Sequence, residues 1–154
     1  MNRIAILGSA DFAERIINIC ATIDGMEIVG FFDGNRAKGE IISGYSVLGK
    51  DEDVEEYYHN NMFDSIFIGI GYSHFEVRDR LFRQFHRKIP MASIIHPTAI
   101  IHPTAQIGEG VMIAEGSIIG ENCILEDDVT ICPGVLFFFG YYIGSDLDGI
   151  TEKI

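Results

Sequence analysis

The feature that most constrains this 154-residue chain is a six-residue period in its second half. Residues 95–99 read IHPTA, and the same five letters return at residues 101–105. A helix repeats about every 3.6 residues and a strand every 2, so neither explains this period. Every sixth residue from the first is large and apolar: Ile95, Ile101, Ile107, Ile113, Ile119, Leu125, Ile131, Phe137 and Ile143. The pattern requires a chain that bends at this interval and points one large side chain inward each time.

Two further columns keep step with the large residues. Three places after each large residue stands a residue that suits a turn: Thr98, Thr104, Gly110, Gly116, Asn122, Asp128, Gly134, Gly140 and Asp146. Four places after each stands a mostly small residue: Ala99, Ala105, Val111, Ser117, Cys123, Val129, Val135, Tyr141 and Leu147. Gly, Asn and Asp tolerate left-handed dihedrals. The columns therefore predict a triangular β-solenoid of about three coils, over residues 95–112, 113–130 and 131–148.

The first half of the chain has a different pattern. Apolar runs at residues 3–7, 27–32 and 65–70 are typical of buried strands, and helical spacing follows at 11–23 and after residue 73. This alternation predicts a small parallel sheet with helices on its faces, which is a Rossmann-like α/β domain. We therefore expect two domains, at residues 1–90 and 91–154.

Charge and composition exclude several classes of protein. The net charge of −12 argues against nucleic acid and anionic membranes as partners. Of the 11 basic residues only Lys153 lies beyond Pro90, so the second half is acidic. The three cysteines lack C-x-x-C spacing and are predicted to be buried thiols. The sequence shows neither a leader nor an apolar run of about eighteen residues, so we expect a cytoplasmic protein.

Three loops are expected to meet at the carboxyl edge of the sheet, where α/β folds bind ligands. They are residues 8–11, 33–35 and 69–73. The first opens a helix, whose free N–H groups and dipole favour a phosphate, and Asp33 can accept hydrogen bonds from a ribose or a base. Ala10 stands where a G-x-G-x-x-G motif has its second glycine, so simple tight turns remain the alternative.

Five stretches, taken in this order, resemble bacterial hexapeptide-repeat sugar acetyltransferases of the NeuD/PglD-like family, which modify UDP-linked amino sugars or sialic acid. They are residues 6–14, 30–34, 44–49, 67–71 with Arg78, and 92–99. The resemblance covers about residues 3–136. It implies a nucleotide-sugar-binding N-terminal domain, followed by a left-handed parallel β-helix that holds acetyl-CoA between the subunits of a homotrimer. It implies no metal.

The resemblance also implies a reaction and a set of binding residues. The reaction is acetyl transfer from acetyl-CoA to an amine or hydroxyl of a nucleotide-linked sugar, with UDP as the expected nucleotide. The residues that would face the nucleotide-sugar are Gly8, Ser9, Ala10, Asp11, Phe12, Asp33, Gly34, Asn35, Gly69, Gly71 and Tyr72.

The family's catalytic base is a histidine of the β-helix, and no residue here matches it. The last histidine is His102, and both His96 and His102 precede prolines in the opening coil, where the family uses His-Pro structurally. The acids at residues 126–128 are the clustered alternatives. Because Lys153 alone faces nine carboxylates beyond Pro90, we expect weak CoA binding by this chain alone.

Two rival functions therefore stay open. One is a catalytically silent nucleotide-sugar-binding or partner subunit, and the other is a purely structural trimerisation module. The aromatic segment FFFGYY at residues 137–142 also leaves two interpretations. If exposed, its rings form an apolar patch for subunit contact or for capping the coil, and if buried they plug it.

Overall fold

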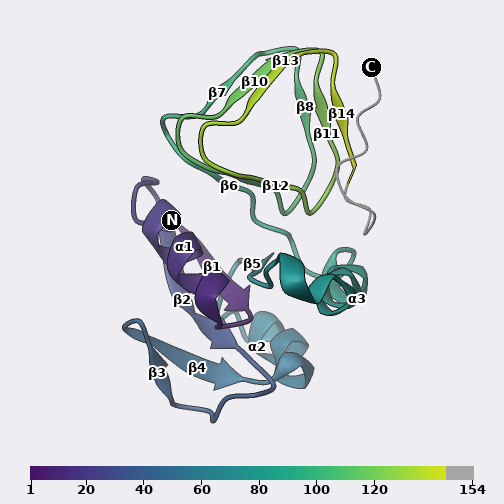
Figure 1. Cartoon of the computed structure of the whole chain (residues 1–154). Coiled ribbons are helices and arrows are strands. Elements are labelled where there is room, and N and C mark those ends of the chain that lie inside the picture. The colour runs from purple at the N-terminus through teal and green to yellow at the C-terminus, as the bar shows by residue number, and fades with distance from the viewer. Residues whose placement is uncertain (145–154) are drawn as a thin grey trace. The chain divides into compact units, whose positions relative to one another are not determined.

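The computed structural model describes residues 1–144, with the backbone alone for Tyr72. Internal contacts divide the chain into two compact units, Met1–Ala92 and Ser93–Ile154, which we call the N-terminal and C-terminal units. Figure 1 shows the sheet and helices of the first unit and the stacked coils of the second.

The N-terminal unit is built on one five-stranded sheet in the order β3-β4-β2-β1-β5. Its strands are β1 (Asn2–Leu7), β2 (Met26–Phe32), β3 (Ile41–Ile42), β4 (Tyr45–Gly49) and β5 (Ser65–Ile68). The parallel pairing of β4, β2, β1 and β5 confirms the predicted Rossmann-like sheet. The antiparallel strand β3 makes the sheet mixed, and neither β3 nor β4 was predicted. They are short, and a tight turn with positive φ at Ser43 and Gly44 joins them.

Three helices accompany the sheet: α1 (Asp11–Cys20), α2 (Val54–His59) and α3 (Phe75–Phe85), with short 3-10 turns at η1 (Asp51–Asp53) and η2 (Tyr72–His74). Helix α1 ends before the predicted residue 23, because Thr22 and Ile23 donate their N–H groups to carbonyls three residues back. No helix within residues 1–144 is long and apolar enough to cross a membrane.

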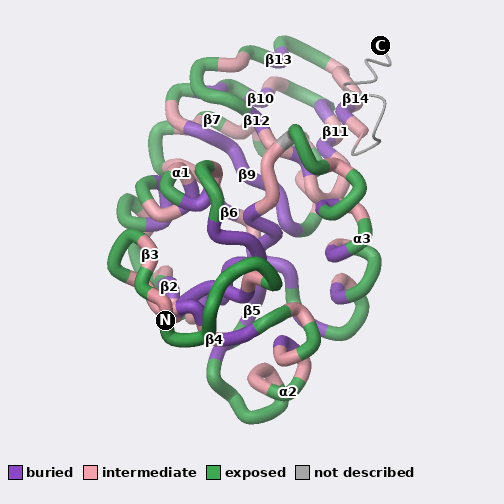
Figure 2. Tube along the Cα trace, turned by 60° about the horizontal axis from the view of Figure 1, so that its bottom comes forward, coloured by how far each residue is buried: buried purple, intermediate pink, exposed green. Residues whose placement is uncertain are grey.

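One core cluster of the N-terminal unit lies between the sheet and helices α2 and α3, and α1 buries a second apolar face. Leu7, Phe32 and Ile68, the last residues of β1, β2 and β5, are all at most 1% exposed. The ring of Phe32 packs edge-on against Phe63, with centroids 5.9 Å apart. Strand β5 is buried along its whole length (Figure 2). Because these strand ends are fixed in a dry core, the loops that follow them start from rigid positions.

The C-terminal unit is a triangular parallel β-helix (Figure 1). Its strands are β6 (Ile94–Ile95), β7 (Ile100–Ile101), β8 (Gln106–Ile107), β9 (Met112–Ile113), β10 (Ile118–Glu121), β11 (Ile124–Leu125), β12 (Thr130–Ile131), β13 (Leu136–Phe139) and β14 (Tyr142–Ile143). They form three sheets of three strands. Ile100 pairs with Ile118 and Ile118 with Leu136, eighteen residues apart each time (118 − 100 and 136 − 118). Within the described residues, this register gives a coil of eighteen residues, which is three hexads.

The inward and turn columns also fold as predicted. The large column forms one apolar cluster, with the first-coil residues Ile95, Ile101 and Ile107 only partly buried. Six consecutive corners have φ between 58° and 69°: Gly110, Gly116, Asn122, Asp128, Gly134 and Gly140. The sequence places residues that tolerate this left-handed geometry at every one of these corners. Asp146 and Leu147, the last residues of the two smaller columns, lie outside the described residues.

In the aromatic segment some rings are buried and others are exposed, so each interpretation holds for some of its residues. Phe137 is 7% exposed, and the half-buried Tyr141 packs against it with ring centroids 5.7 Å apart. Phe138 and Phe139 are 75% and 57% exposed, so β13 is mostly exposed in Figure 2. The inward rings fill the coil, and the outward rings leave an apolar surface.

Candidate functional site

Three loops lie at the carboxyl ends of the neighbouring strands β2, β1 and β5. We call residues 8–10 loop 1, residues 33–40 loop 2 and residues 69–71 loop 3. Gly8 N–H donates to Phe32 O at 2.8 Å, and Gly69 N–H donates to Leu7 O at 2.7 Å. These bonds extend the sheet ladder into the loops. Each predicted nucleotide-sugar residue lies in one of these loops, at the start of α1 or, for Tyr72, at the start of η2.

Loops 1 and 3 pack closely enough to require glycine. Gly8 has φ +99°, and a Cβ there would lie 2.5 Å from Ile70 Cδ1 and 3.1 Å from Gly69 O. A Cβ on Gly69 would lie 2.6 Å from Ile6 Cγ2. A Cβ on Gly71 would be in ordinary contact with Phe12 at 3.7 Å. The glycines therefore bring two backbone loops and the start of α1 together at the rim.

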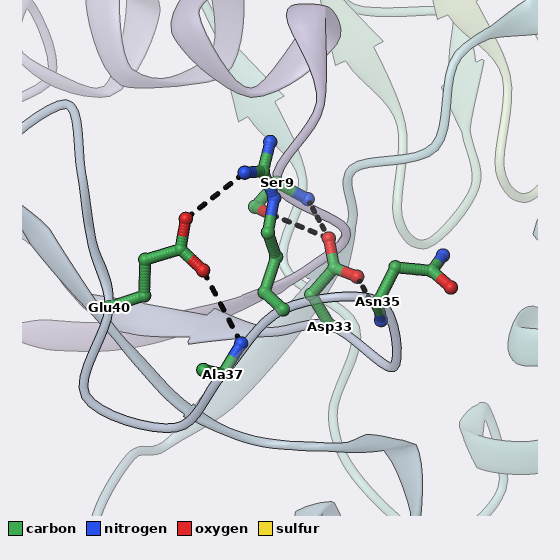
Figure 3. A network of polar contacts seen from close by, with 6 residues as sticks. Ser9, Asp33, Asn35, Ala37 and Glu40 are labelled. Atoms are coloured by element: carbon green, nitrogen blue, oxygen red, sulfur yellow. Dashed lines mark hydrogen bonds and ion pairs between the residues drawn. The ribbon is translucent and has the colours of Figure 1, made fainter.

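Asp33 joins loop 1 to loop 2 (Figure 3). Its Oδ2 accepts from Ser9 N at 3.0 Å and from Ser9 Oγ at 2.5 Å, while Oδ1 accepts from Asn35 N at 2.8 Å. Ser9 is 4% exposed, so its side of this contact is shielded from water. A carboxylate has roughly four lone-pair sites, and three are used here. The carboxylate expected to bind a ribose or a base thus already holds the two loops together.

The start of α1 differs from a simple phosphate site. Ala10 is the N-cap and makes no side-chain capping bond, and both Asp11 and Glu14 lie in the first turn. Their carboxylates interact favourably with the helix dipole, as acidic side chains do at a helix start. The same carboxylates repel a phosphate.

Sequence reasoning assigned no role in these loops to three residues that shape them, although Arg78 was part of the family resemblance. Arg78 of α3 is 5% exposed, and its Nη1 donates to Ile70 O at 2.8 Å, which fixes the carbonyl of loop 3. In loop 2, Arg36 Nη1 lies 3.0 Å from Glu40 Oε1, and Ala37 N–H donates to Glu40 Oε2 at 3.3 Å. The Arg–Glu spacing of four residues directly after Asp33 was the available signal for the second group.

His96 and His102 build the first two corners of the β-helix. Thr98 N–H donates to His96 Nδ1 at 3.1 Å, the Thr98 hydroxyl lies 2.8 Å from the same nitrogen, and Gly116 N–H donates to Thr98 Oγ1 at 3.0 Å. His102 and Thr104 repeat this arrangement. Because a backbone N–H must donate, Nδ1 is an acceptor, so the neutral ring carries its proton on Nε2. The Nδ1 atom of each ring is thus occupied by its own corner.

The clustered acids of residues 126–128 also lie at a corner. Asp127 Oδ1 accepts from Glu109 N at 2.7 Å, in the preceding coil. Asp128 has φ 59°, and its N–H donates to Glu109 O at 2.8 Å. Asp127 therefore links two coils. Within residues 1–144, no group of three or more His, Cys, Asp or Glu side chains is arranged to hold a metal ion.

The cysteines differ in exposure. Cys20 and Cys123 are buried as predicted, whereas Cys132 is exposed and the prediction was wrong there. Cys132 directly follows the inward Ile131, so the alternation of the strand turns it outward. Burial raises the pKa of Cys20 to about 12, because a thiolate is poorly solvated in the core beneath α1.

With this geometry established, the sequence can be compared with known families. Residues 3–85 match the PglD N-terminal domain, which is more than half of the chain. The chain belongs to the PglD N-terminal domain family. Residues 104–137 also match the bacterial transferase hexapeptide family (six repeats). No curated protein matches the chain.

Solved structures of acetyltransferases share the fold of this PglD-family chain. PerB from Caulobacter crescentus, solved with CoA and GDP-perosamine, is 21% identical over 95% of this chain and 68% of that chain, with a TM-score of 0.83. The acetyltransferase domain of PglB from Neisseria gonorrhoeae, solved with acetyl coenzyme A, is 20% identical over 94% and 68%, with a TM-score of 0.79. These matches confirm a Rossmann-like unit followed by a left-handed β-helix.

A variant of the Caulobacter GDP-perosamine N-acetyltransferase, with one histidine replaced by alanine, was also solved with CoA and GDP-perosamine. It is 21% identical over 94% of this chain and 66% of that one, with a TM-score of 0.83. The present chain thus spans about two thirds of the length of these relatives.

Proposed function

We propose that this chain acts in nucleotide-sugar acetylation. The N-terminal unit binds the nucleotide-linked sugar at loops 1 to 3, and the acetyl group passes from acetyl-CoA to an amine or hydroxyl of that sugar. The observation that carries the proposal is the order of the two families along one chain, a PglD N-terminal domain and then hexapeptide repeats. The loops that Asp33 and the glycines join at the sheet edge supply a preformed place for the ligand.

The nucleotide is either UDP or GDP. The family resemblance favours UDP, and the Caulobacter relative was solved with a GDP-linked sugar. Asp33 retains one acceptor site on Oδ1, and the side-chain amide of Asn35 points away from Asp33 at the exposed rim (Figure 3). An amide and a carboxylate can pair with the N–H and carbonyl edges of uracil or guanine. Parallel titrations with UDP and GDP decide between the two bases.

Acetyl transfer needs a base as well as two substrates. The nitrogen or oxygen of the sugar attacks the thioester carbonyl, the thiolate of CoA leaves, and a base removes the proton from the attacking atom. His96 and His102 hold their corners through Nδ1, and Asp127 is bonded to an amide of the preceding coil. The clustered acids Glu126, Asp127 and Asp128 are the solenoid candidates for this base, to be tested by substitution to Gln and Asn.

Binding of CoA by this chain alone should be weak. Residues 93–144 contain no Lys or Arg and six acids, namely Glu109, Glu115, Glu121, Glu126, Asp127 and Asp128. Phosphates are usually bound by Lys and Arg, and the acids repel them. A dissociation constant for acetyl-CoA in the low micromolar range, measured by calorimetry on the chain alone, would contradict this expectation.

We further propose a homotrimer formed through the outer face of the sheet β13-β10-β7. Ile100, Ile118 and Leu136 stack on that face in adjacent coils and are 61%, 38% and 60% exposed. Phe138 of the same strand as Leu136 is 75% exposed. A continuous apolar ladder of this kind is unfavourable in water and is covered best by copies of the same chain.

The test combines binding with turnover. Calorimetry with a UDP-linked and a GDP-linked amino sugar should show saturable binding by the wild type, and substitution of Asp33 by Ala should remove it. Release of the CoA thiol from acetyl-CoA should then depend on the same sugar. Sugar binding without thiol release would assign this chain the role of a silent binding or partner subunit. No binding of either sugar would leave only the structural module and refute the proposal.

A further inference from the structure

A nucleoside diphosphate bound at loops 1 to 3 brings negative charge to a rim that is already acidic. Asp11 and Glu14 lie in the first turn of α1, and Asp33 lies at the start of loop 2. None of the hydrogen bonds that join loops 1 and 2 through Asp33 involves a cationic side chain. A phosphate at this rim therefore needs a positive group close to loop 2.

Arg36 is in loop 2 itself. Its backbone N–H donates to Asp33 O at 3.4 Å, which ties its position to the end of β2. Its side chain is 44% exposed, and its guanidinium makes a single contact with Glu40, at 3.0 Å. Within the described residues, the other four of its N–H groups (a guanidinium has about five) have no hydrogen-bond partner. The Arg36 guanidinium is therefore charged and accessible, and only one of its N–H groups is bonded.

Glu40 is held more firmly than Arg36. Its N–H donates to Ala37 O at 3.0 Å, its carbonyl accepts from Val47 N at 2.8 Å, and its Oε2 accepts from Ala37 N at 3.3 Å. Figure 3 shows the carboxylates of Glu40 and Asp33 turned toward the same side of the loop. Glu40 thus presents a fixed anion, to which the longer arginine side chain attaches at one nitrogen.

Two other cations near these loops contact other groups. Arg78 is buried and holds Ile70 O, and Lys38 Nζ lies over the Tyr57 ring at 5.4 Å from its centroid. Arg83 pairs with Asp79 at 2.8 Å on α3, with the same spacing of four residues as Arg36 and Glu40. That second pair is a natural control because it lies on a helix and not in a loop of the site.

We propose that Arg36 binds the phosphates of the nucleotide-linked sugar, and that Glu40 competes with the ligand for the guanidinium. This inference rests on the proposed function and adds the residue that recognises the charged part of the ligand. The planar guanidinium can donate to two phosphate oxygens at once, whereas its present contact uses one carboxylate oxygen. An exposed pair four residues apart is weak, so a phosphate can take Arg36 from Glu40 at small cost.

The experiment compares ligands with and without phosphates. Calorimetry on the full chain uses UDP and GDP, with uridine and guanosine as phosphate-free counterparts. The variants are Arg36→Gln and Glu40→Gln, with Arg83→Gln and Asp79→Asn as controls that make the same charge changes on α3. All four positions are at least partly exposed, so the substitutions leave the core intact.

The expected result has three parts. Arg36→Gln weakens binding of the nucleoside diphosphate by about 10- to 100-fold and changes nucleoside binding by less than about twofold. Glu40→Gln tightens diphosphate binding by about two- to fivefold, and both controls stay within about twofold of the wild type. Added salt weakens diphosphate binding of the wild type more than that of Arg36→Gln.

Other outcomes overturn the inference. If Arg36→Gln binds the diphosphate within twofold of the wild type, the phosphate-binding role of Arg36 is refuted and the proposed function stays intact. An equal loss of affinity for diphosphate and nucleoside would have the same meaning. Weaker binding in Glu40→Gln would refute the competition. A wild type that binds neither diphosphate refutes the proposed function, and this inference with it.

Discussion

The hydrogen bond between Ser9 and Asp33 should be the strongest side-chain contact of the candidate site. A double-mutant cycle with Ser9→Ala and Asp33→Ala isolates the Oγ–Oδ2 contact of 2.5 Å, because the Ser9 N–H remains in both backgrounds. Hydrogen bonds to charged groups contribute about 1.5–3 kcal/mol. Ser9 is 4% exposed but Asp33 is half-buried, so solvent screening lowers the expected coupling to about 1–2 kcal/mol.

The molecule supplies a matched control at the start of β5. Ser65 is also 4% exposed, and its Oγ donates to the neutral side-chain oxygen of Asn2 at 3.0 Å. Ser65→Ala should therefore cost only about 0.5–1.5 kcal/mol, and less than Ser9→Ala. Ser65 starts β5 and so lies away from the loops, and its loss should leave nucleotide affinity unchanged.

The assay has a stability readout and a binding readout. Urea denaturation gives the free energies of unfolding, and hydrogen exchange of peptides from β1 and β2 assigns the loss to the N-terminal unit, since two units need not unfold together. Nucleotide affinity should fall about three- to tenfold in Ser9→Ala because loop 1 loses its side-chain tie to loop 2. A coupling energy below about 0.3 kcal/mol would show that the short contact does not hold the loops.

Three further predictions concern packing, titration and assembly. Gly120→Ala would place a Cβ against the carbonyl oxygen of Phe138 in the next coil, so it should lower the free energy of unfolding by about 3 kcal/mol or more. Gly134→Ala has open space but φ +69°, so it should cost about 1–2 kcal/mol. Urea denaturation measures both, and equal costs would contradict the predicted steric effect. Burial raises the pKa of Cys20 from 9.0 to about 12, so the thiol stabilises the fold fully below about pH 9 and loses that contribution as pH rises toward 12. Cys20→Val should therefore reduce the loss of unfolding free energy at alkaline pH, and an unchanged loss would argue against this prediction. Leu136→Asp should convert the proposed trimer to monomers in sedimentation or light scattering, and a monomeric wild type would rule out this assembly.

The solenoid is the part of the fold that the sequence predicts best. Each coil places the same three kinds of residue at the same three positions, so a local pattern repeats wherever the structure repeats. Ile119 and Asn122 illustrate this: the first is fully buried, and the second has the left-handed φ of 58° that its place in the turn column requires. Strands β3 and β4 escaped prediction because a short hairpin has too few residues to show a period.

The candidate site could be located from the sequence but not described. The order of strands and glycine turns places loops 1 to 3 at one edge, since parallel strands end on the same side of a sheet. The sequence also suggests that Asp33 faces a ligand. It does not contain the distance between Ser9 and Asp33, which are 24 residues apart and meet because β1 and β2 pair.

The sequence by itself determined that this chain makes a β-helix after an α/β unit, because six-residue spacing and strand–helix alternation are local properties that only these architectures satisfy. The tertiary structure decided which polar groups are already occupied. Asp33 is bonded to Ser9, His96 accepts at Nδ1 from its own corner, and Arg36 touches Glu40 with one nitrogen. The physical reason is that hydrogen bonds depend on ångström-scale distances between segments, and these are fixed only when the sheet and the coils have packed.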